Sequence, residues 1–521
     1  MGSSVVFSSS VQLLAVGALT IFVVVFARIF VRRSGGPPFP PGPQPDPLIG
    51  NIRQMGSNDL KVLFEQWGKE YGPIVYASTF GKPLIILNSF GVAHDLLQKR
   101  GSIYSSRPRL VTFSEMMGWG YVLSQLSGGP RFRKHRKITQ ETMGARCMNE
   151  YAPLQKKATC MFLADLGDTS ANFVDHIKRF SASTILGITY GYTPQGVEDE
   201  FIQLAHQATL ESFRYGGPGT SICDLVPFLK YWPTWMPFSF HQKHAAYTRT
   251  IVEKLFSLPF EWVETKMAEG THKSLTGDLL NNMKEGKMMF GETLDYEDIK
   301  HISGAIYAAG YDTTAATLET FLFAMMLNPD VYEKAQRTID EQIGRDRLIE
   351  PSDRENLPYI SCLLKEVLRW GVPVPLGVPH LLIQDDVYDG YFVPGGSSVI
   401  FNVWAMTRNE EVYPEPEAFN PDRFLHPSSQ QAHEHVEAVW GFGRRICPGR
   451  TFAEANLWLC IANFIATMDI KEVVNEDERV ITPPAAFVSG AIRHPKPFLC
   501  SITYRSEHAR QLVADAKMGS P

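Results

Sequence analysis

The chain has 521 residues and a net charge of −5, with 44% hydrophobic and 12% aromatic residues. This length allows a large hydrophobic core, and the composition is that of a globular protein. A mildly acidic balance gives no reason to expect nucleic acid as a partner. The seven cysteines are odd in number and include no Cys-x-x-Cys pair, which is typical of a reducing compartment.

The amino terminus predicts a single membrane anchor. Val11–Val31 is a run of 21 mostly apolar residues, long enough as a helix to span the roughly 30 Å core of a bilayer. Arg32 and Arg33 follow the run, whereas residues 1–10 carry no charged side chain. The positive-inside rule then leaves the downstream chain in the cytosol. A cleaved signal peptide is the alternative, but the run is too long and no basic segment precedes it.

Composition divides the chain into three regions. Residues 1–33 form the tail and the transmembrane anchor. Residues 34–50 are rich in proline, cannot be helical and predict a stiff, extended hinge. Residues 51–521 then form one large globular domain.

The domain opens with helices and strands in alternation. Apolar spacing predicts a helix over 58–71, two strands within 73–87 that turn at 81–83, and a helix over 91–100. Residues 104–127 are irregular but rich in large apolar side chains. An irregular segment of that length inside a compact domain is typical of a binding element.

A concentrated basic segment follows. Six of the seven residues in Arg131–Lys137 are basic or potentially basic. A solvated face is the ordinary interpretation of such a run. A patch for an acidic partner and an arginine contact to an anionic ligand are the alternatives.

Residues 150–300 have mostly helical patterns, with one aromatic interruption at Asp224–Phe238. This segment is broken by prolines and carries Trp232, Trp235 and Phe238. The three rings fit either insertion into a lipid interface or packing into the core.

Ile299–Met326 predicts a long apolar helix with polar residues in its interior. Its small residues leave space for a large group to lie against the helix; they are Ala305, Ala308, Ala309 and Gly310. Asp312, Thr313 and Thr314 follow directly. A buried acid is costly without a partner or a function, and a threonine there can bond back to a helix carbonyl. A plain polar edge of the helix is the alternative.

Another helix is predicted over Leu357–Trp370. Its Glu366 and Arg369 are spaced to meet on one face, among apolar neighbours that favour a buried pair over an ordinary surface one. Extended chain and short strands follow up to residue 400. Phe419–Phe424 is a turn that places Arg423 between aromatic residues.

The glycine-rich loop Trp440–Gly449 contains a single thiol, Cys447, ahead of an apolar helical run. A free cysteine is most often a small buried hydrophobe. It can also be a nucleophile, because arginines and a helix amino terminus favour a thiolate. The third interpretation is a metal ligand, with glycines that let the backbone approach a flat ligand.

Several common motifs are missing. Glu437 stands where a zinc protease motif starting at His433 needs its second histidine. No phosphate-binding loop, dinucleotide fingerprint or Gly-x-Ser-x-Gly elbow occurs in the sequence context that each requires. These absences disfavour hydrolase and nucleotide-dependent functions.

Four of these segments together resemble the membrane-bound haem-thiolate cytochrome P-450 superfamily. Trp440–Gly449 matches the haem loop, and Ala309–Thr314 matches the oxygen-activation motif. Glu366–Arg369 matches the Glu-x-x-Arg motif, and Phe419–Phe424 matches the turn that adds Arg423 to it. They occur in the family's order and spacing. The resemblance extends from the anchor to about residue 500. The second half is similar to the fungal group that contains O-methylsterigmatocystin oxidoreductase.

The resemblance implies a mainly α fold with small β-sheets, in a single large haem domain behind the transmembrane helix. It implies haem b (iron protoporphyrin IX), with Cys447 as the axial iron ligand that donates electron density. Three glycines would let the loop fold beneath the porphyrin: Gly441, Gly443 and Gly449. The propionates would be bound by Arg136, His380 and Arg445. One departure is Phe132, since the family usually has a tryptophan there whose indole bonds a propionate.

On the opposite side, the resemblance implies that Ala309 and Gly310 leave room for dioxygen. Asp312 and Thr313 would deliver protons during its activation. The roles of Glu366, Arg369 and Arg423 would be to hold the haem-side fold.

We expect a neutral, lipophilic small-molecule substrate, because the candidate pocket walls contain no charged anchor. These walls are Phe113, Met116, Met117, Trp119, Ala305, Ala309, Leu376, Val378, Phe487 and Val488. The reaction would be a monooxygenation in fungal secondary metabolism or xenobiotic oxidation.

Electrons would come from a separate NADPH–cytochrome P-450 reductase, with cytochrome b5 as an optional second donor. The reductase would dock near Arg133, Lys134 and Lys137. We expect a monomeric catalytic unit, held by a single-pass anchor in the endoplasmic reticulum membrane with its domain in the cytosol.

The same motifs allow two other functions. A haem-thiolate isomerase or dehydratase would rearrange a peroxide without external electrons, but it does not need the intact Asp312–Thr313 pair. A haem carrier or electron-transfer protein is disfavoured, because transfer cytochromes fill both axial positions of the iron.

Overall fold

The computed structural model describes residues 36–518, except for 57–58, 215–220, 271, 427, 474–485 and 489. The predicted anchor within residues 1–33 therefore lies outside the described residues. In the part of the chain that is described, no helix is both long enough and apolar enough to cross a membrane. The described part of the hinge is irregular and lies against strands: the Tyr76 amide donates to the Pro41 carbonyl and the Phe392 amide to that of Pro38.

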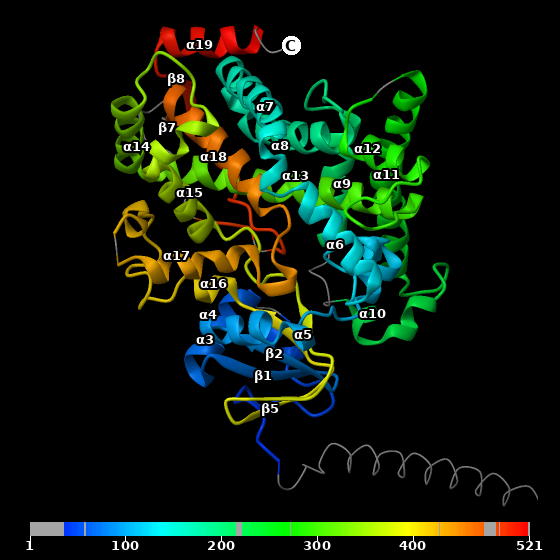
Figure 1. The fold of residues 1–521 in the computed structure, drawn as a ribbon. Helices are drawn as coiled ribbons and strands as arrows, with labels where there is room; N and C mark the ends of the chain where they lie inside the picture. Colours follow the sequence, from blue (N-terminus) through cyan, green and yellow to red (C-terminus); the bar gives the residue numbers. More distant parts are fainter. Residues whose placement is uncertain are drawn as a thin grey trace, which may run out of the picture.

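Helices dominate the described chain and surround one long central helix (Figure 1). In the amino-terminal half they are α2 (Ile52–Met55), α3 (Leu60–Tyr71), α4 (Phe90–Ala93), α5 (Gly101–Tyr104), α6 (Pro130–Thr142), α7 (Met148–Asp168), α8 (Phe173–Tyr190), α9 (Glu200–Phe213), α10 (Ile222–Leu225) and α11 (Phe240–Glu269). The rest are α12 (Leu275–Lys284), α13 (Tyr296–Leu327), α14 (Pro329–Gln342), α15 (Pro358–Gly371), α16 (Val403–Met406), α17 (Gln430–Val436), α18 (Arg450–Thr467) and α19 (Glu507–Met518). The expectation of a mainly α fold is confirmed.

Three small sheets complete the fold. Their strands are β1 (Ile74–Thr79), β2 (Lys82–Leu87), β3 (His380–Leu381), β4 (Asp386–Tyr388), β5 (Tyr391–Val393), β6 (Ser398–Phe401), β7 (Met468–Glu472) and β8 (Cys500–Tyr504). The largest sheet has the order β1-β2-β6-β3, in which β2 and β6 are parallel and the other pairs antiparallel. β4 pairs with β5, and β7 pairs with β8.

Two elements of the structure differ in detail from those predicted from the sequence. The β1–β2 turn lies at Phe80–Gly81, where both residues have positive φ, so Lys82 and Pro83 belong to β2 and not to the turn. The helix expected over 91–100 is interrupted, because α4 passes into a wider π-type turn over His94–Lys99.

The central helix α13 packs closely against its neighbours at two of its glycines. A Cβ added to Gly304 would lie 2.0 Å from the Phe256 ring of α11, and one added to Gly310 would lie 2.8 Å from Ile185 of α8. Gly304 and Gly310 therefore allow close helix packing, and side chains of α8, α11 and α13 form part of one buried core cluster.

Candidate active site

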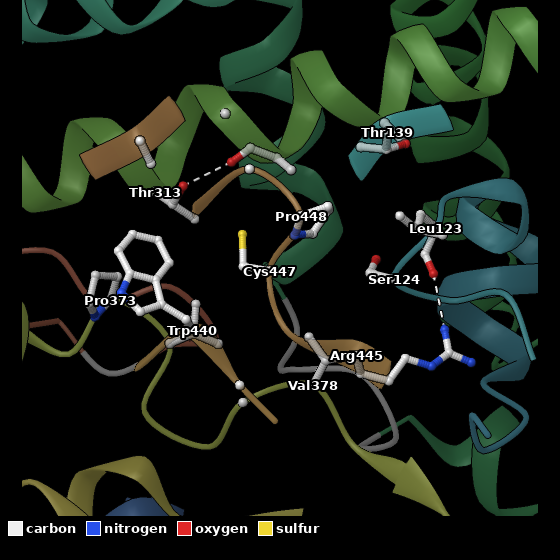
Figure 2. A pocket seen from close by; sticks show the side chains of 18 of the residues that line it. Leu123, Ser124, Thr139, Thr313, Pro373, Val378, Trp440, Arg445, Cys447 and Pro448 are labelled. Carbon is white, nitrogen blue, oxygen red and sulfur yellow. Dashed lines mark hydrogen bonds between the residues drawn. The ribbon is translucent and has the colours of Figure 1, made fainter. Parts of the chain in front are cut away.

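A cavity separates α13 from the loop that carries Cys447 (Figure 2). Figure 2 shows the Cys447 sulfur pointing from its loop toward α13 and Thr313. The lining brings together many of the predicted site residues, from four separate segments of the chain. They are Arg136, Ala305, Ala309, Gly310, Thr313, Val378, His380, Gly441, Arg445, Cys447 and Gly449.

The Cys447 loop is a tight turn whose glycines are required by geometry. Gly441 and Gly443 have φ values of 80° and 52°, which strain any residue with a Cβ. A Cβ on Gly443 would also lie 2.5 Å from the Leu97 carbonyl oxygen. The loop closes where the Cys447 amide donates to the Trp440 carbonyl at 2.7 Å, directly before α18 begins.

The Cys447 thiol is open to the cavity but otherwise enclosed by protein. Burial raises its pKa, while the backbone N–H groups of Gly449 and Arg450 and the charge of Arg136 act in the opposite direction. Donors to a sulfur anion are thus present, yet the protein alone does not favour the thiolate. A metal ion bound to the sulfur would supply the missing stabilisation.

Three guanidinium groups gather at one side of the cavity. Arg445 donates to the carbonyls of Ser105 and Leu126, at 2.6 and 2.7 Å, and Arg136 donates to that of Ile446. Arg107 donates to the carbonyls of Ser124 and Val378, each at 2.7 Å. Within the described residues, none of the three forms an ion pair with a carboxylate.

This desolvated charge is unfavourable without an anion. Burial, and then the charge of Arg445, lowers the pKa of Arg107 well below its usual value. The pKa of Arg445 falls to about 10, first through burial and then through Arg136. Buried charges require pairing, so this side of the cavity fits a ligand with carboxylate groups.

His380 lies beside the same cluster. Its Nδ1 is 2.8 Å from the Tyr104 carbonyl oxygen, which identifies Nδ1 as the protonated nitrogen. Burial, followed by the charge of Arg107, lowers its pKa well below the ordinary value. His380 is therefore a neutral group next to three cations.

On the opposite wall, Thr313 faces the cavity from α13. Its hydroxyl donates to the Ala309 carbonyl at 2.9 Å, drawn as a dashed line in Figure 2. Ser181 of α8 donates to the Gly310 carbonyl at 3.1 Å, so α13 is supported here by side chains. Asp312 is not among the lining residues, and its carboxylate is directed to His494, 3.4 Å away.

The Glu366–Arg369 pair lies outside the cavity and is completely buried. Two hydrogen bonds of 2.7 and 2.8 Å join the side chains, and Arg423 contacts Glu366 at 3.2 Å. Arg369 also donates to the Thr407 and Pro416 carbonyls. The three side chains fasten α15 to the long segment between α16 and α17.

The predicted substrate residues do not all meet. Ala305, Ala309 and Val378 line this cavity. Phe113, Met117 and Trp119 are buried in the core between α8, α11 and α13, with Met116 packed against them. The remaining three lie elsewhere: Leu376 packs near the β1–β2 strands, Phe487 makes an edge-to-face contact with Trp370, and Val488 is exposed.

The side chains of the basic segment Arg131–Lys137 have different surroundings. Lys134 and His135 contact the Asp298 carboxylate at 2.6 and 2.8 Å, and this joins α6 to the start of α13. Arg136 faces the cavity, whereas Arg133 is exposed. Phe132, in the position expected for tryptophan, lies under the Arg445 guanidinium at 3.7 Å, a cation–π contact that orients Arg445.

Two residues of the site region were not found from sequence. Arg107 is buried at the cavity, and its only available signal is an arginine next to a proline within the irregular segment 104–127. His494 pairs with Asp312 across 182 residues, and no local pattern indicates such a contact.

The cavity fits haem: a thiol faces a wall with small residues, and an unpaired cationic cluster lies at one side. This combination defines a haem-thiolate enzyme.

Comparison with known proteins gives the same result. The sequence profile of the cytochrome P-450 family matches residues 40–501. Cytochrome P-450 monooxygenase 136 of Postia placenta is 37% identical over 508 residues, covering 96% of this chain and 95% of that protein. A cytochrome P-450 monooxygenase of Armillaria gallica is 34% identical, with 96% and 98% covered. Monooxygenase claR of Ampulloclitocybe clavipes is 35% identical, with 97% and 94% covered.

The chain therefore belongs to the cytochrome P-450 family. It is an oxygenase enzyme, and its cofactor is haem b.

Proposed function

We propose that the protein inserts one oxygen atom of O₂ into a neutral, lipophilic small molecule. The observation that carries this proposal is the placement of Cys447 and Thr313 on opposite walls of one cavity that also contains the cationic cluster. Bound haem supplies the activation of dioxygen, and the protein positions the substrate and excludes water.

The residues divide into three roles in this proposal. Cys447 is the axial ligand. Arg107, Arg136 and Arg445 bind the haem carboxylates by charge-assisted hydrogen bonds. Thr313 and Asp312 hold and move protons on the α13 side.

A neutral substrate is supported by the α13 wall. The lining residues that α13 contributes are Ala305, Ile306, Ala309, Gly310, Thr313, Thr314 and Thr317, none of which is charged. Such a wall gives no counter-ion for a charged substrate. Lipophilic secondary metabolites or foreign compounds are therefore the proposed substrate class.

Electrons are proposed to come from NADPH through a separate reductase, with cytochrome b5 as an optional donor. Arg133 is exposed and suited to an acidic partner. Lys137 is exposed too but pairs with Glu292 at 3.6 Å, and Lys134 is bound to Asp298. The alternative, an isomerase that acts on a peroxide, is not favoured, because Asp312 and Thr313 would have no task in it.

Attachment to a membrane, with the catalytic domain in the cytosol, is also proposed, and exposed aromatic residues between α10 and α11 support the membrane contact. Trp235 and Phe238 are 80 and 95% exposed, and so is the neighbouring Tyr231 at 77%, whereas Trp232 is only 37% exposed. Packing into the core therefore does not explain Trp235 and Phe238. In Figure 1, α10 and the blue start of the described chain both lie at the lower side of the molecule. An anchor in residues 1–33 and the aromatic residues could thus contact one membrane.

The test is oxygen incorporation. Purified protein, reductase, NADPH and ¹⁸O₂ are incubated with lipophilic candidates that displace water from the iron. We expect one ¹⁸O atom in the product and NADPH consumption that depends on substrate. Conversion of a peroxide without NADPH, and without label from ¹⁸O₂, would contradict a monooxygenase and support the isomerase.

A further inference from the structure

His494 connects two acidic residues of α13 that lie next to the cavity. Its Nδ1 is 2.9 Å from Glu319 Oε2, and its Nε2 is 3.4 Å from Asp312 Oδ2. The two acids are seven residues apart, about two helical turns, and therefore share one face of α13. The side chains of His494, Asp312 and Glu319 are 26, 13 and 8% exposed.

The backbone holds His494 at this position. The neighbouring Arg493 donates to the Trp370 and Gly371 carbonyls at the end of α15, and its guanidinium lies over the Trp404 and Phe487 rings. The Val488 amide donates to the His494 carbonyl at 2.8 Å. A residue fixed in this way is not a surface histidine that meets an acid by chance.

The surroundings favour a charged imidazole. Burial acts against the imidazolium, but the hydrogen bonds to Asp312 and Glu319 outweigh it and raise the pKa of His494 to about 10. Nearby, α8 contributes Asp175 and Lys178, and α9 contributes His206, whose pKa burial lowers. Asp175, Asp312, Glu319 and Lys178 together carry a net charge of −2, and protonation of His494 reduces it to −1.

This pairing turns Asp312 away from the cavity, which is lined instead by the adjacent Thr313. We propose that His494 is a positioning residue that holds the Asp312 carboxylate and supplies the proton that Asp312 passes toward Thr313. This inference rests on the proposed proton-delivering role of Asp312.

In the step, the Nε2–H bond of His494 breaks and an O–H bond forms on Asp312. His494 is left as a neutral imidazole whose Nδ1–H remains bonded to Glu319. Solvent reprotonates it through its exposed edge. Glu319 is thereby assigned the task of fixing the tautomer, as carboxylates do for other catalytic histidines.

The test uses full-length holoenzyme with reductase and compares His494→Gln with wild type. We expect an unchanged ferrous–CO spectrum, but peroxide release per NADPH that rises roughly tenfold, less than the 10²–10⁴ typical of a complete proton-transfer effect. The solvent isotope effect on coupled turnover should also rise. His508→Gln is the matched control, because His508 is an exposed histidine 3.8 Å from Asp346; it should behave as wild type.

Asp312→Asn separates the two ways to fail. If it uncouples turnover and His494→Gln does not, the role of His494 is overturned while that of Asp312 stands. If neither variant uncouples, the proposed role of Asp312 fails, and the inference fails with it.

A readout independent of turnover is the imidazole itself. Wild-type protein is labelled with ¹⁵N-histidine and studied in its diamagnetic ferrous–CO form. The signals that are missing from the His494→Gln spectrum are those of His494. At pH 8 they should be the signals of an imidazolium. The Glu319→Gln substitution should lower the titration midpoint of His494. A neutral His494 at pH 7 would overturn the proposal even if His494→Gln failed to bind haem.

Discussion

Cations without partners are the most informative residues of the cavity. Among the residues that the structure describes, Arg107, Arg136 and Arg445 lose solvation there and receive only neutral carbonyl and amide oxygens in exchange. Their lowered pKa values show that the protein alone disfavours the three charges. Binding of a dicarboxylate restores the balance, so the free energy of haem binding is expected to depend on each of them.

Replacing Arg107 by leucine tests this dependence. Loss of a charge-assisted bond, worth about 1.5–3 kcal/mol, should weaken haem binding roughly 10- to 100-fold. The rate of haem transfer to an excess of apomyoglobin measures the effect. Arg109→Leu is the control, because Arg109 is exposed and pairs with Glu115. Equal rates for both variants would remove Arg107 from the haem site.

His494 predicts a pH dependence of stability. Its pKa in the folded protein, about 10, lies above the ordinary value of 6.5. Its contribution is therefore complete below pH 6.5 and is lost as the pH rises through 10. The thermal midpoint should fall over this range in wild type and fall less in His494→Gln. Parallel curves for the two proteins would contradict the charged imidazole.

Sequence patterns located the residues whose neighbours are close in the chain. Cys447 stands among glycines, Thr313 interrupts an apolar helix, and Glu366 faces Arg369 one turn away. Arg107 and His494 have partners 271 and 182 residues distant. Such contacts depend on how whole helices and strands pack, and the spacing of residues along the chain does not predict that packing.

At the scale of elements, the buried triad joins α15 to the turn at Phe419–Phe424. Glu366 accepts two hydrogen bonds from Arg369 and one each from Arg423 and the Asn420 amide. Because all its oxygens are engaged without solvent, the loss of Glu366 leaves Arg369 buried and unpaired.

Glu366→Ala should therefore destabilise the protein by about 3–5 kcal/mol, the usual cost of breaking a buried pair from one side. Urea unfolding followed by circular dichroism gives this free energy. Glu253→Ala removes one member of an exposed i,i+4 pair with Arg249 and should cost less than about 1 kcal/mol. A similarly small change for Glu366→Ala would mean that the triad does not support the fold.

Long periodic helices were predictable, and short irregular elements were not. The apolar periods of α13 and α15 give these helices to within a few residues. The π-type turn at His94–Lys99 and the burial of Trp119 do not follow from a local apolar period. Trp119 donates to Ser212 of α9 at 2.8 Å and stacks on Phe113, so tertiary contacts fix a segment that has no period of its own.

On the scale of the whole molecule, α10, which precedes the exposed aromatic residues, and the start of the described chain both lie in the lower part of Figure 1. Protein lacking residues 1–33 should retain weak binding to phospholipid vesicles through Trp235 and Phe238. Serine at both positions should reduce vesicle binding in flotation assays and leave the haem spectrum unchanged. Leu499→Ser is the control, since Leu499 is exposed beside β8 at the opposite side of Figure 1. Equal flotation of all variants would exclude this surface as a membrane contact.

The central claim is that Cys447 binds the haem iron as a thiolate. Reduction of the full-length holoenzyme in the presence of carbon monoxide tests it most directly, because a thiolate opposite CO shifts the Soret band strongly to the red. We predict this shifted band in wild type and its absence in a folded, haem-loaded Cys447→His variant. An unshifted band in folded, haem-loaded wild-type protein would contradict the assignment of Cys447 and the function derived from it.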